Sequence, residues 1–274
     1  MINLLYAGNA GIFDGILISV LSATKHTREP LKISLLTMDK KDTDKRFAPL
    51  DESMRSFLEK LCKEANGESS VGLFDVGDLY DKYLEGSPNA QTGYTPYCFL
   101  RLFASRLPLP DKVLYLDADT VVNADLSELF STNVSGFEYA AALDYYGKIF
   151  MGYHYINSGV MLLNLAEIRK TGLFEKAVRL CSEKKIFLPD QTALHRLTTR
   201  KLILPRKYNE QKRYDRRDTV IQHFTKTILW FPFFHTRTVK PWQTELVREV
   251  LTTRYDGLLE EYIQKKKEYE ETKK

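Results

Sequence analysis

The sequence is poor in cysteine and in long hydrophobic runs, and each shortage argues against a class of protein. Its three cysteines, Cys62, Cys98 and Cys181, are widely spaced along 274 residues. This odd, sparse set argues against a disulfide framework and suits a reducing cytosol. No uninterrupted apolar stretch approaches the roughly 20 residues of a membrane-spanning helix. Because Met1–Tyr6 lacks the basic region of a signal peptide, we expect a first strand there and a cytoplasmic protein.

The net charge of +4 is small and does not indicate nucleic-acid binding. The positive charge is uneven, however, with eight basic residues between Arg200 and Arg217 and five lysines from Lys265 onward. One interpretation is a solvated surface. The other is peripheral association with an anionic membrane, to which each basic residue near the surface contributes about 1 kcal/mol.

Strand-like and helix-like segments alternate through the first half of the chain. Apolar runs predict strands over 2–7, 33–36, 71–76 and 113–116. Apolar residues at helical spacing predict helices over 13–21, 54–61 and 97–107, and a loop rich in Gly, Ser and Pro is expected over 86–96. This order predicts an α/β fold with a mostly parallel sheet and helices on both faces.

The second half is less regular. Short strands are expected over 139–143, 160–163, 202–204 and 220–224, and a helix over 173–185. We find no internal repeat and no linker that would divide the chain. The sequence therefore predicts one domain over residues 1–242, with a smaller α+β continuation, followed by a polar and basic helical tail over 243–274.

The segment Val113–Thr120 carries the strongest functional signal. Its apolar run ends in two carboxylates one residue apart, Asp117 and Asp119. Carboxylates at the end of a strand lie at the carboxyl edge of the sheet, where open α/β folds bind ligands. Two such charges repel each other unless a cation lies between them, and Mg²⁺ and Mn²⁺ prefer carboxylate and phosphate oxygens. The segment predicts metal-assisted chemistry on a phosphorylated substrate.

Without reference to any family, each of three other polar residues allows two interpretations. His223 is either a buried histidine bonded to the backbone or a metal ligand. Arg101 is either a helix-surface residue or the partner of an acidic group. Asp190, which follows Pro189, is either a helix cap or part of a site. The aromatic stretch 230–235 is a candidate wall for stacking on an acceptor sugar.

Several of these pieces occur together in the order typical of one family. They are the N-terminal strand and helix, Arg101 before Asp117-Ala118-Asp119, the run Asn157-Ser158-Gly159-Val160-Met161-Leu162-Leu163-Asn164, then Asp190-Gln191, His223-Phe224 and Lys240-Pro241-Trp242. From Leu5 to Trp242 the chain resembles the retaining glycosyltransferases of family 8, which include glycogenin and bacterial lipopolysaccharide galactosyl- and glucosyltransferases. The resemblance implies a GT-A fold, with a Rossmann-like mixed sheet flanked by helices.

The resemblance also implies a role for each matched residue. Asp117, Asp119 and His223 would bind a divalent ion, and imidazole among the ligands favours Mn²⁺ over Mg²⁺. The residues that would contact the nucleotide sugar are Ala7, Asn9, Ile12, Arg101, Ala118, Asn157 and Lys240. Among them, Lys240 would contact the diphosphate. Asp144, Asp190 and Gln191 would be catalytic residues around the transferred sugar. Because Gln191 is a poor nucleophile, same-face attack by the acceptor is favoured, while Asp144 and Asp190 stay open as stabilisers or nucleophiles.

The implied reaction transfers glucose or galactose from a UDP-sugar to a hydroxyl of a glycan or glycolipid, with retention. Two alternatives remain. Asp117-Ala118-Asp119-Thr120 also matches the motif of haloacid-dehalogenase-like phosphatases, in which the first Asp is the nucleophile. That motif usually follows the first strand of its domain, whereas here it follows three predicted strands and no later acidic cluster appears. The other alternative is a non-catalytic nucleotide-sugar-binding protein.

Overall fold

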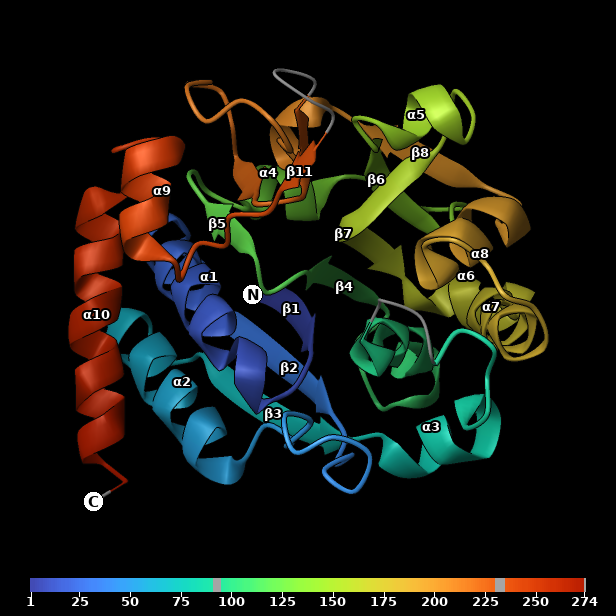
Figure 1. Cartoon of the computed structure of the whole chain (residues 1–274), viewed down its shortest axis with the longest axis horizontal. Helices are drawn as coiled ribbons and strands as arrows, with labels where there is room; N and C mark the ends of the chain where they lie inside the picture. The colour runs from blue at the N-terminus through green and yellow to red at the C-terminus, as the bar shows by residue number, and fades with distance from the viewer. Residues whose placement is uncertain (91–94, 230–234, 274) are drawn as a thin grey trace.

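A computed structural model describes residues 1–90, 95–229 and 235–273. A seven-stranded sheet runs through its centre in the order β3-β2-β1-β4-β7-β6-β8 (Figure 1). The strands are β1 (Ile2–Ala7), β2 (Leu31–Thr37), β3 (Ser70–Asp75), β4 (Lys112–Leu116), β6 (Tyr139–Leu143), β7 (Ile156–Asn164) and β8 (Lys201–Leu204). Only β7 runs antiparallel to its neighbours, β4 and β6. The predicted mixed, mostly parallel sheet is confirmed.

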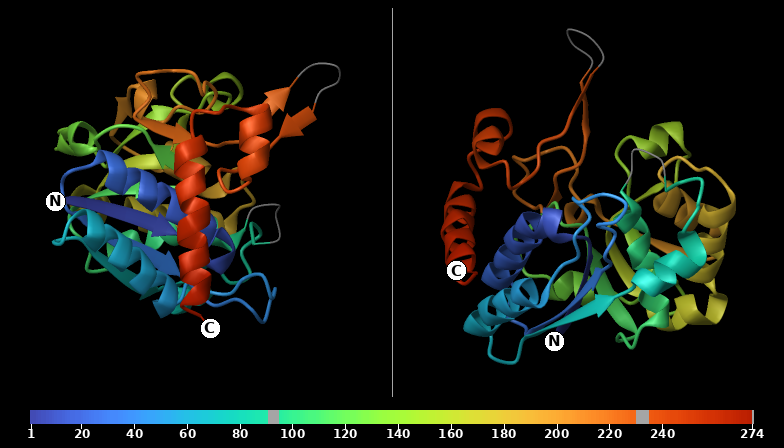
Figure 2. Two further views of the ribbon diagram at one scale, coloured as in Figure 1. Left: turned by 90° about the vertical axis from the view of Figure 1, so that its left-hand side faces the viewer. Right: turned by 60° about the horizontal axis from the view of Figure 1, so that its bottom comes forward.

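Helices cover both faces of the sheet, as the alternation of strands and helices predicted (Figures 1 and 2). Successive side chains of a strand point to opposite faces, so Leu4 and Leu5 of β1 enter two separate cores. The first core lies under α1 (Phe13–His26), α2 (Glu52–Ala65) and α10 (Asp256–Glu271). The second lies under α3 (Gly77–Leu84), α6 (Leu165–Thr171), α7 (Leu173–Glu183), α8 (Pro189–Leu197) and the 3₁₀ helix η2 (Pro96–Arg106).

The helix expected over 97–107 is present as the 3₁₀ helix η2. Nearly all of its residues are buried, from Tyr97 to Ser105. A segment without a polar face has no apolar stripe, so its sequence cannot distinguish a period of 3.0 from one of 3.6 residues. The consequence for function is that Arg101, in the middle of η2, is buried rather than exposed on a helix surface.

Shorter elements complete the side of the sheet where the strands β1 and β4 end. They are η1 (Ala10–Ile12), β5 (Thr120–Val122), α5 (Gly147–Phe150), η3 (Arg206–Tyr208) and β9 (Ile221–His223). The helix α4 (Ser127–Ser131) instead ends near the start of β4, where Nζ of Lys112 donates to the carbonyl of Thr132. The strands β5 and β9 pair antiparallel, with Thr120 opposite His223. This pairing brings two segments about a hundred residues apart in the chain to the same place.

The C-terminal helices α9 (Thr244–Val250) and α10 lie along one side of the molecule, next to α1 and α2 (Figure 1). The Tyr269 ring of α10 lies between the rings of Phe13 and Phe57, with centroids 4.8 and 5.1 Å away. Lys265 and Lys266 form ion pairs with Glu64 and Asp14. The predicted boundary after residue 242 stays a prediction. Within the described ranges, no helix is long and apolar enough to cross a membrane.

Candidate active site

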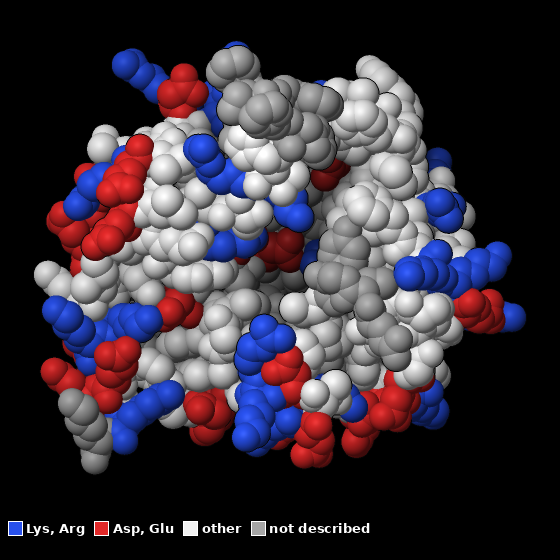
Figure 3. Space-filling view, in the orientation of Figure 1, with Lys and Arg blue, Asp and Glu red and all other residues white. Residues whose placement is uncertain are grey.

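The candidate site lies where the strand order reverses. The chain passes from β1 to β2 and β3 on one side of β1, and then returns to β4 on the other side. In open α/β sheets ligands bind at such a switch point, beside the carboxyl ends of the strands. Ala7 ends β1 there, Asn9 follows that strand, and Asp117 follows β4. Figure 3 shows this face of the molecule hollowed near its middle, with acidic and basic atoms in and around the hollow.

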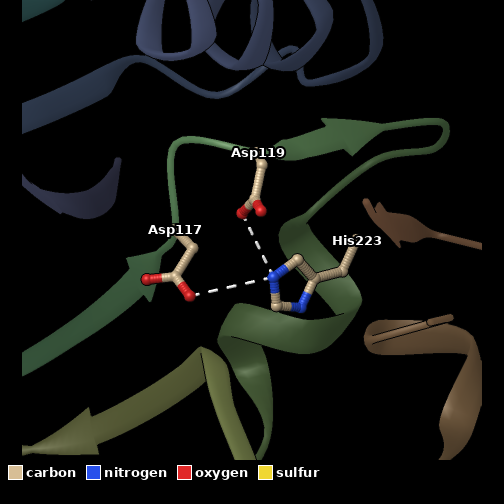
Figure 4. Close-up of side chains that lie close together, drawn as sticks. All are labelled: Asp117, Asp119 and His223. Carbon is tan, nitrogen blue, oxygen red and sulfur yellow. Dashed lines mark ion pairs between the residues drawn. The ribbon is translucent and has the colours of Figure 1, made fainter. Parts of the chain in front are cut away.

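Asp117 and Asp119 lie in the turn between β4 and β5, and they converge at this edge of the sheet with His223 of β9 (Figure 4). The Nε2 atom of His223 lies 3.1 Å from Oδ1 of Asp119 and 3.7 Å from Oδ2 of Asp117. One ligand atom of each residue lies within 4.8 Å of the other two. The three side chains predicted as metal ligands therefore lie close together, and their role as ligands stays a prediction.

Gly159 of β7 makes this convergence possible. A Cβ atom at position 159 would lie 2.0 Å from Cε1 of His223 and 2.8 Å from Oδ2 of Asp117. Contacts this short are not tolerated, so only glycine lets the imidazole and the carboxylate approach the strand. The backbone at Gly159 also fixes the first aspartate, since its carbonyl accepts a 2.8 Å hydrogen bond from the amide of Asp117.

A chain of hydrogen bonds determines which nitrogen of His223 carries the proton. The backbone amide of Gly159 donates to Oδ1 of Asn157 at 3.0 Å, which identifies that atom as the amide oxygen. The same oxygen therefore accepts from Nδ2 of Asn209 at 2.9 Å. The remaining atom of Asn209, Oδ1, faces Nδ1 of His223 at 3.1 Å, so Nδ1 must donate. In the neutral ring the lone pair then resides on Nε2, which faces the two carboxylates.

Lys240 completes the charged group around Asp119. Its Nζ atom donates to Oδ2 of Asp119 and, at 3.3 Å, to the carbonyl of Phe224. Burial raises the pKa of Asp119, whereas Lys240 and His223 lower it. The lowering is the larger effect, so the pKa of Asp119 lies well below its ordinary value. The residue predicted to contact the diphosphate thus lies beside the carboxylates predicted to bind the metal. Residues 230–234 of the intervening segment lie outside the described chain.

Arg101 links this cluster to a second buried acid. Its guanidinium donates to Asp117 Oδ1 at 2.9 Å and to the carbonyl of Ser158, lies 3.3 Å from Asp190 Oδ2, and stacks 4.1 Å above the Tyr115 ring. Burial raises the pKa of Asp190, and Arg101 only partly offsets it. The Oδ2 atom of Asp190 is buried and receives no aligned hydrogen bond from the residues that the structure describes. That atom is available to a substrate hydroxyl.

The other residues predicted to surround the sugar form one network. Asp144 Oδ2 accepts from Asn157 at 2.9 Å and from Gln191 Nε2 at 3.5 Å. Gln191 Oε1 accepts from the amide and hydroxyl of Ser158 at 2.9 and 3.2 Å. Asn157 therefore connects Asp144 to Asn209, and through it to His223. The residues predicted around the sugar and those predicted to bind the metal therefore share one hydrogen-bonded network.

A cavity of about 750 Å³ opens beside β1 and β2. This volume falls within the range typical of small-molecule sites, roughly 300–1,000 Å³. Asn9 and Ile12, predicted to hold the uridine, both line it. Ala7 instead packs partly against the second core, and Ala118 is buried next to Gly15, whose Cβ would lie 2.5 Å from the Ala118 carbonyl.

Sequence reasoning missed several residues of the site. Phe47 and Tyr80 are the aromatic side chains of the cavity wall, where Lys40 and Arg46 add positive charge. Tyr115, whose hydroxyl donates to Asp117 at 2.6 Å, and Asn209 support the metal end. Ser158 and Gly159 belong to the run Asn157–Asn164, which the sequence analysis had already singled out, so they could have been predicted. Asn209 and Phe47 lie in segments without a recognisable motif, so the sequence alone does not identify them.

The predicted acceptor wall cannot be placed in full. Residues Trp230–Phe234 lie outside the described residues. The strands next to them, β10 (Thr227–Leu229) and β11 (His235–Arg237), pair antiparallel and project from the body of the molecule (Figure 2). His235 is exposed at the start of β11.

Fold and site together define an α/β protein with a carboxylate–histidine cluster beside a nucleotide-sized cavity. Solved structures with this architecture include the galactosyltransferase LgtC, in complex with donor and acceptor sugar analogs, at a TM-score of 0.69, 17% identity and 96% coverage of both chains. The glycosyltransferase GlyE of Streptococcus pneumoniae TIGR4 follows at 0.59 and 21% identity, covering 97% of this chain and 65% of GlyE. The fold is GT-A.

The family model described as Glycosyl transferase family 8 matches residues 3–245. The chain therefore belongs to glycosyltransferase family 8. Glycosyltransferase GlyA of Streptococcus pneumoniae serotype 4 is 28% identical over 198 residues, which are 70% of this chain but only 25% of GlyA. Lipopolysaccharide 1,2-glucosyltransferase of Escherichia coli K12 is 27% identical over 88% of this chain and 72% of that enzyme.

Proposed function

We propose that the protein transfers a hexose, glucose or galactose, from a UDP-sugar to a hydroxyl of a glycan or glycolipid, with retention at the anomeric carbon. The observation that carries the proposal is the convergence of Asp117, Asp119 and His223, with Lys240 beside them, next to a nucleotide-sized cavity. Family membership supports the nucleotide-sugar donor. The names of two similar proteins, the galactosyltransferase LgtC and lipopolysaccharide 1,2-glucosyltransferase, support a hexose and a glycan acceptor.

The donor atoms of the cluster fit a divalent cation. Two carboxylates and an imidazole lone pair face one another, which is unfavourable unless a cation lies between them. The mixed oxygen and nitrogen set favours Mn²⁺, with Mg²⁺ the other choice. When bound, such an ion neutralises charge that develops on a departing diphosphate. Asp117, Asp119 and His223 would hold it.

Lys240 and Asp190 would contact the donor directly, and Arg101 would position the carboxylates around it. Lys240, half-buried at the same end, can move from Asp119 to a phosphate oxygen and stabilise the leaving group. Arg101 holds Asp117 and Asp190 in place and would keep the two carboxylates from moving apart. Asp190 Oδ2 lacks an aligned hydrogen bond and is free to accept one from a sugar hydroxyl.

The fixed position of Gln191 favours same-face attack by the acceptor. Both ends of its amide are engaged, Oε1 by Ser158 and Nε2 by Asp144, so it serves to position the sugar. Its uncharged oxygen is a poor nucleophile. Asp144 and Asp190 are the carboxylates predicted beside the sugar, and either would stabilise positive charge that develops on the sugar ring.

Measurement of UDP release from UDP-glucose and UDP-galactose tests the proposal. We expect release with Mn²⁺ present, its loss in EDTA and its loss in Asp119→Asn. The matched control is Asp111→Asn, which alters an exposed aspartate just before the opposite end of β4. Activity that persists in the chelator would contradict the metal role. Phosphate release from sugar phosphates, without UDP release, would favour the phosphatase alternative.

A further inference from the structure

Three cations surround the ring of Tyr145, the residue that follows Asp144 at the end of β6. Lys212 Nζ, the Arg206 guanidinium and Lys148 Nζ lie 4.6, 5.0 and 5.5 Å from the ring centroid. Lys212 also donates a 3.2 Å hydrogen bond to the Tyr145 hydroxyl. The three residues come from α5, η3 and the loop after it, so tertiary structure rather than a run of basic sequence gathers them.

Much of this positive charge is not neutralised by the protein. Arg206 pairs with Glu210, which is fully buried and also lies 3.8 Å from Arg216. Within the described part of the chain, neither Lys148 nor Lys212 has a carboxylate within 4.0 Å. The surrounding positive charge is felt by the phenol, whose pKa is lowered by the hydrogen bond from Lys212 and by the nearby cations. Two lysines thus remain available to an anion.

A cavity adjoins the basic cluster. It has a volume of about 120 Å³, and Leu143, Ile203, Tyr145, Lys148 and Arg206 contribute to its wall. A single water molecule needs only roughly 10–15 Å³ of such space, so the cavity holds a larger group. Its mixed lining of apolar side chains and cations suits an oxyanion carried on a sugar.

The cavity and the catalytic network share one turn of backbone. Asp144 Oδ1 accepts from the amides of Tyr146 and Gly147 at 3.1 and 2.6 Å. Gln211 Oε1 accepts from the amide of Tyr145 at 2.8 Å. The same turn therefore directs Asp144 toward Asn157 and Gln191, and carries Tyr145 and Lys148 into the basic cluster.

The basic cluster borders the residues predicted to surround the transferred sugar. Hydrogen bonds and ion pairs lead from Lys240 and Asp119 through His223, Asn209 and Asn157 to Asp144, and Tyr145 is the next residue of the chain. A donor whose diphosphate lies at Lys240 and whose sugar reaches Asp144 leaves the neighbouring basic cluster to the acceptor.

We propose that Lys148, Arg206 and Lys212 bind an anionic group of the acceptor, a phosphate monoester or a carboxylate on a sugar. This inference rests on the proposed glycosyl transfer, because it takes the neighbouring network to hold the donor sugar. Lysine binds phosphate as a mobile point charge, and the guanidinium nitrogens of Arg206 add directional donors. The site would select charged acceptors over neutral ones and set which hydroxyl faces the donor.

Binding of four small probes tests the proposal. Glucose, glucose 6-phosphate, glucuronate and inorganic phosphate are titrated calorimetrically into the full chain with UDP and Mg²⁺ present. We expect the anionic probes to bind and glucose to bind more weakly. In Lys148→Gln/Lys212→Gln, affinity for the anionic probes should fall by at least about tenfold, or about 1.4 kcal/mol. Binding of glucose 6-phosphate but not glucuronate assigns a phosphate, and equal binding of both assigns any oxyanion.

The control is Lys60→Gln/Lys267→Gln, which removes the same charge from exposed positions on α2 and α10. It should bind the anionic probes as the unaltered protein does. Equal loss in both double variants, unchanged binding in Lys148→Gln/Lys212→Gln, or no binding of any anionic probe would overturn the inference. UDP binding is measured separately. If UDP binds and the anions do not, only the acceptor site is wrong; if UDP does not bind, the proposed function itself fails.

Discussion

At the scale of single residues, Asn209 shows how a side chain that touches no substrate can control a site. Its amide oxygen accepts the Nδ1 proton of His223, and its orientation is set by Asn157 and ultimately by a backbone amide. The metal-facing lone pair of His223 therefore depends on Asn209. Partners of this kind orient metal-ligating histidines in many proteins.

Replacement of Asn209 should weaken metal binding without removing a ligand. We expect Asn209→Leu to lower the affinity for Mn²⁺ by about 10–100-fold, because Nδ1 loses its acceptor and the ring its fixed tautomer. Asn209→Asp keeps an acceptor for Nδ1 and should recover most of the affinity. Mn²⁺ binding measured by electron paramagnetic resonance, with UDP present, provides the readout. Similar affinities for the leucine variant and the unaltered protein would remove Asn209 from this role.

Asp190 should make stability depend on pH. Burial raises its pKa in the folded state above the ordinary value of 3.8, despite Arg101. The folded protein therefore holds this proton more tightly than the unfolded chain, so the contribution of Asp190 to stability is largest in acid. It declines as the pH rises through the unfolded pKa toward the folded one.

The variant Asp190→Asn lacks this titration. The free energy of unfolding of the unaltered protein, minus that of Asp190→Asn, should therefore fall as the pH rises from acid toward neutral. Urea unfolding of both proteins at a series of pH values measures this difference. A difference that stays constant with pH would mean that Asp190 titrates alike in both states.

At the scale of elements, the sequence predicted strands better than it predicted contacts between them. The run Val113–Leu116 and the carboxylates after it are local, so β4 and the position of Asp117 could be read directly. The pairing of β5 with β9 joins residues about a hundred positions apart. The place of His223 in the site was therefore predicted from the family resemblance and not from spacing in the sequence. Nothing in the residues around Lys148 or Asn209 predicts that β6 and η3 lie side by side.

The helix α10 is a second case in which local sequence misleads. Its composition is polar and rich in both lysine and glutamate, which is compatible with a solvated tail. Yet Leu259, Tyr262 and Tyr269 are buried. Lys265 pairs with Glu64 of α2, and Lys266 pairs with Asp14 of α1. A prediction of membrane attraction through these lysines therefore has fewer free charges to rest on.

Removal of the Tyr269 ring should destabilise the whole protein. Tyr269→Ala would leave a cavity between Phe13 and Phe57 and should lower the free energy of unfolding by about 3 kcal/mol. Chemical denaturation measures the loss. Tyr153→Ala serves as the control, since that ring is 76% exposed and should cost little. An equally small effect in both variants would indicate that α10 contributes little to the fold.

At the scale of the whole molecule, the site draws on every part of the chain. Its charged side chains come from the turn after β4, from β9 and from Lys240, and the cavity wall includes segments after β1 and β2. A ligand that binds all of these together can bind the folded state only. Its binding must then raise the stability of the whole protein.

Donor-site ligands should accordingly raise the melting temperature. At a UDP concentration of about 100 times Kd, with Mn²⁺ present, the expected stabilisation is about 2.7 kcal/mol. For a chain of this size that corresponds to a rise of about 5–10 °C. Scanning calorimetry with UDP alone, Mn²⁺ alone and both should show the largest rise with both, because Lys240 and the carboxylates hold the diphosphate and the ion together. In Asp119→Asn the increment due to Mn²⁺ should disappear, whereas Asp111→Asn should keep it. An increment that survives in Asp119→Asn would place the ion elsewhere.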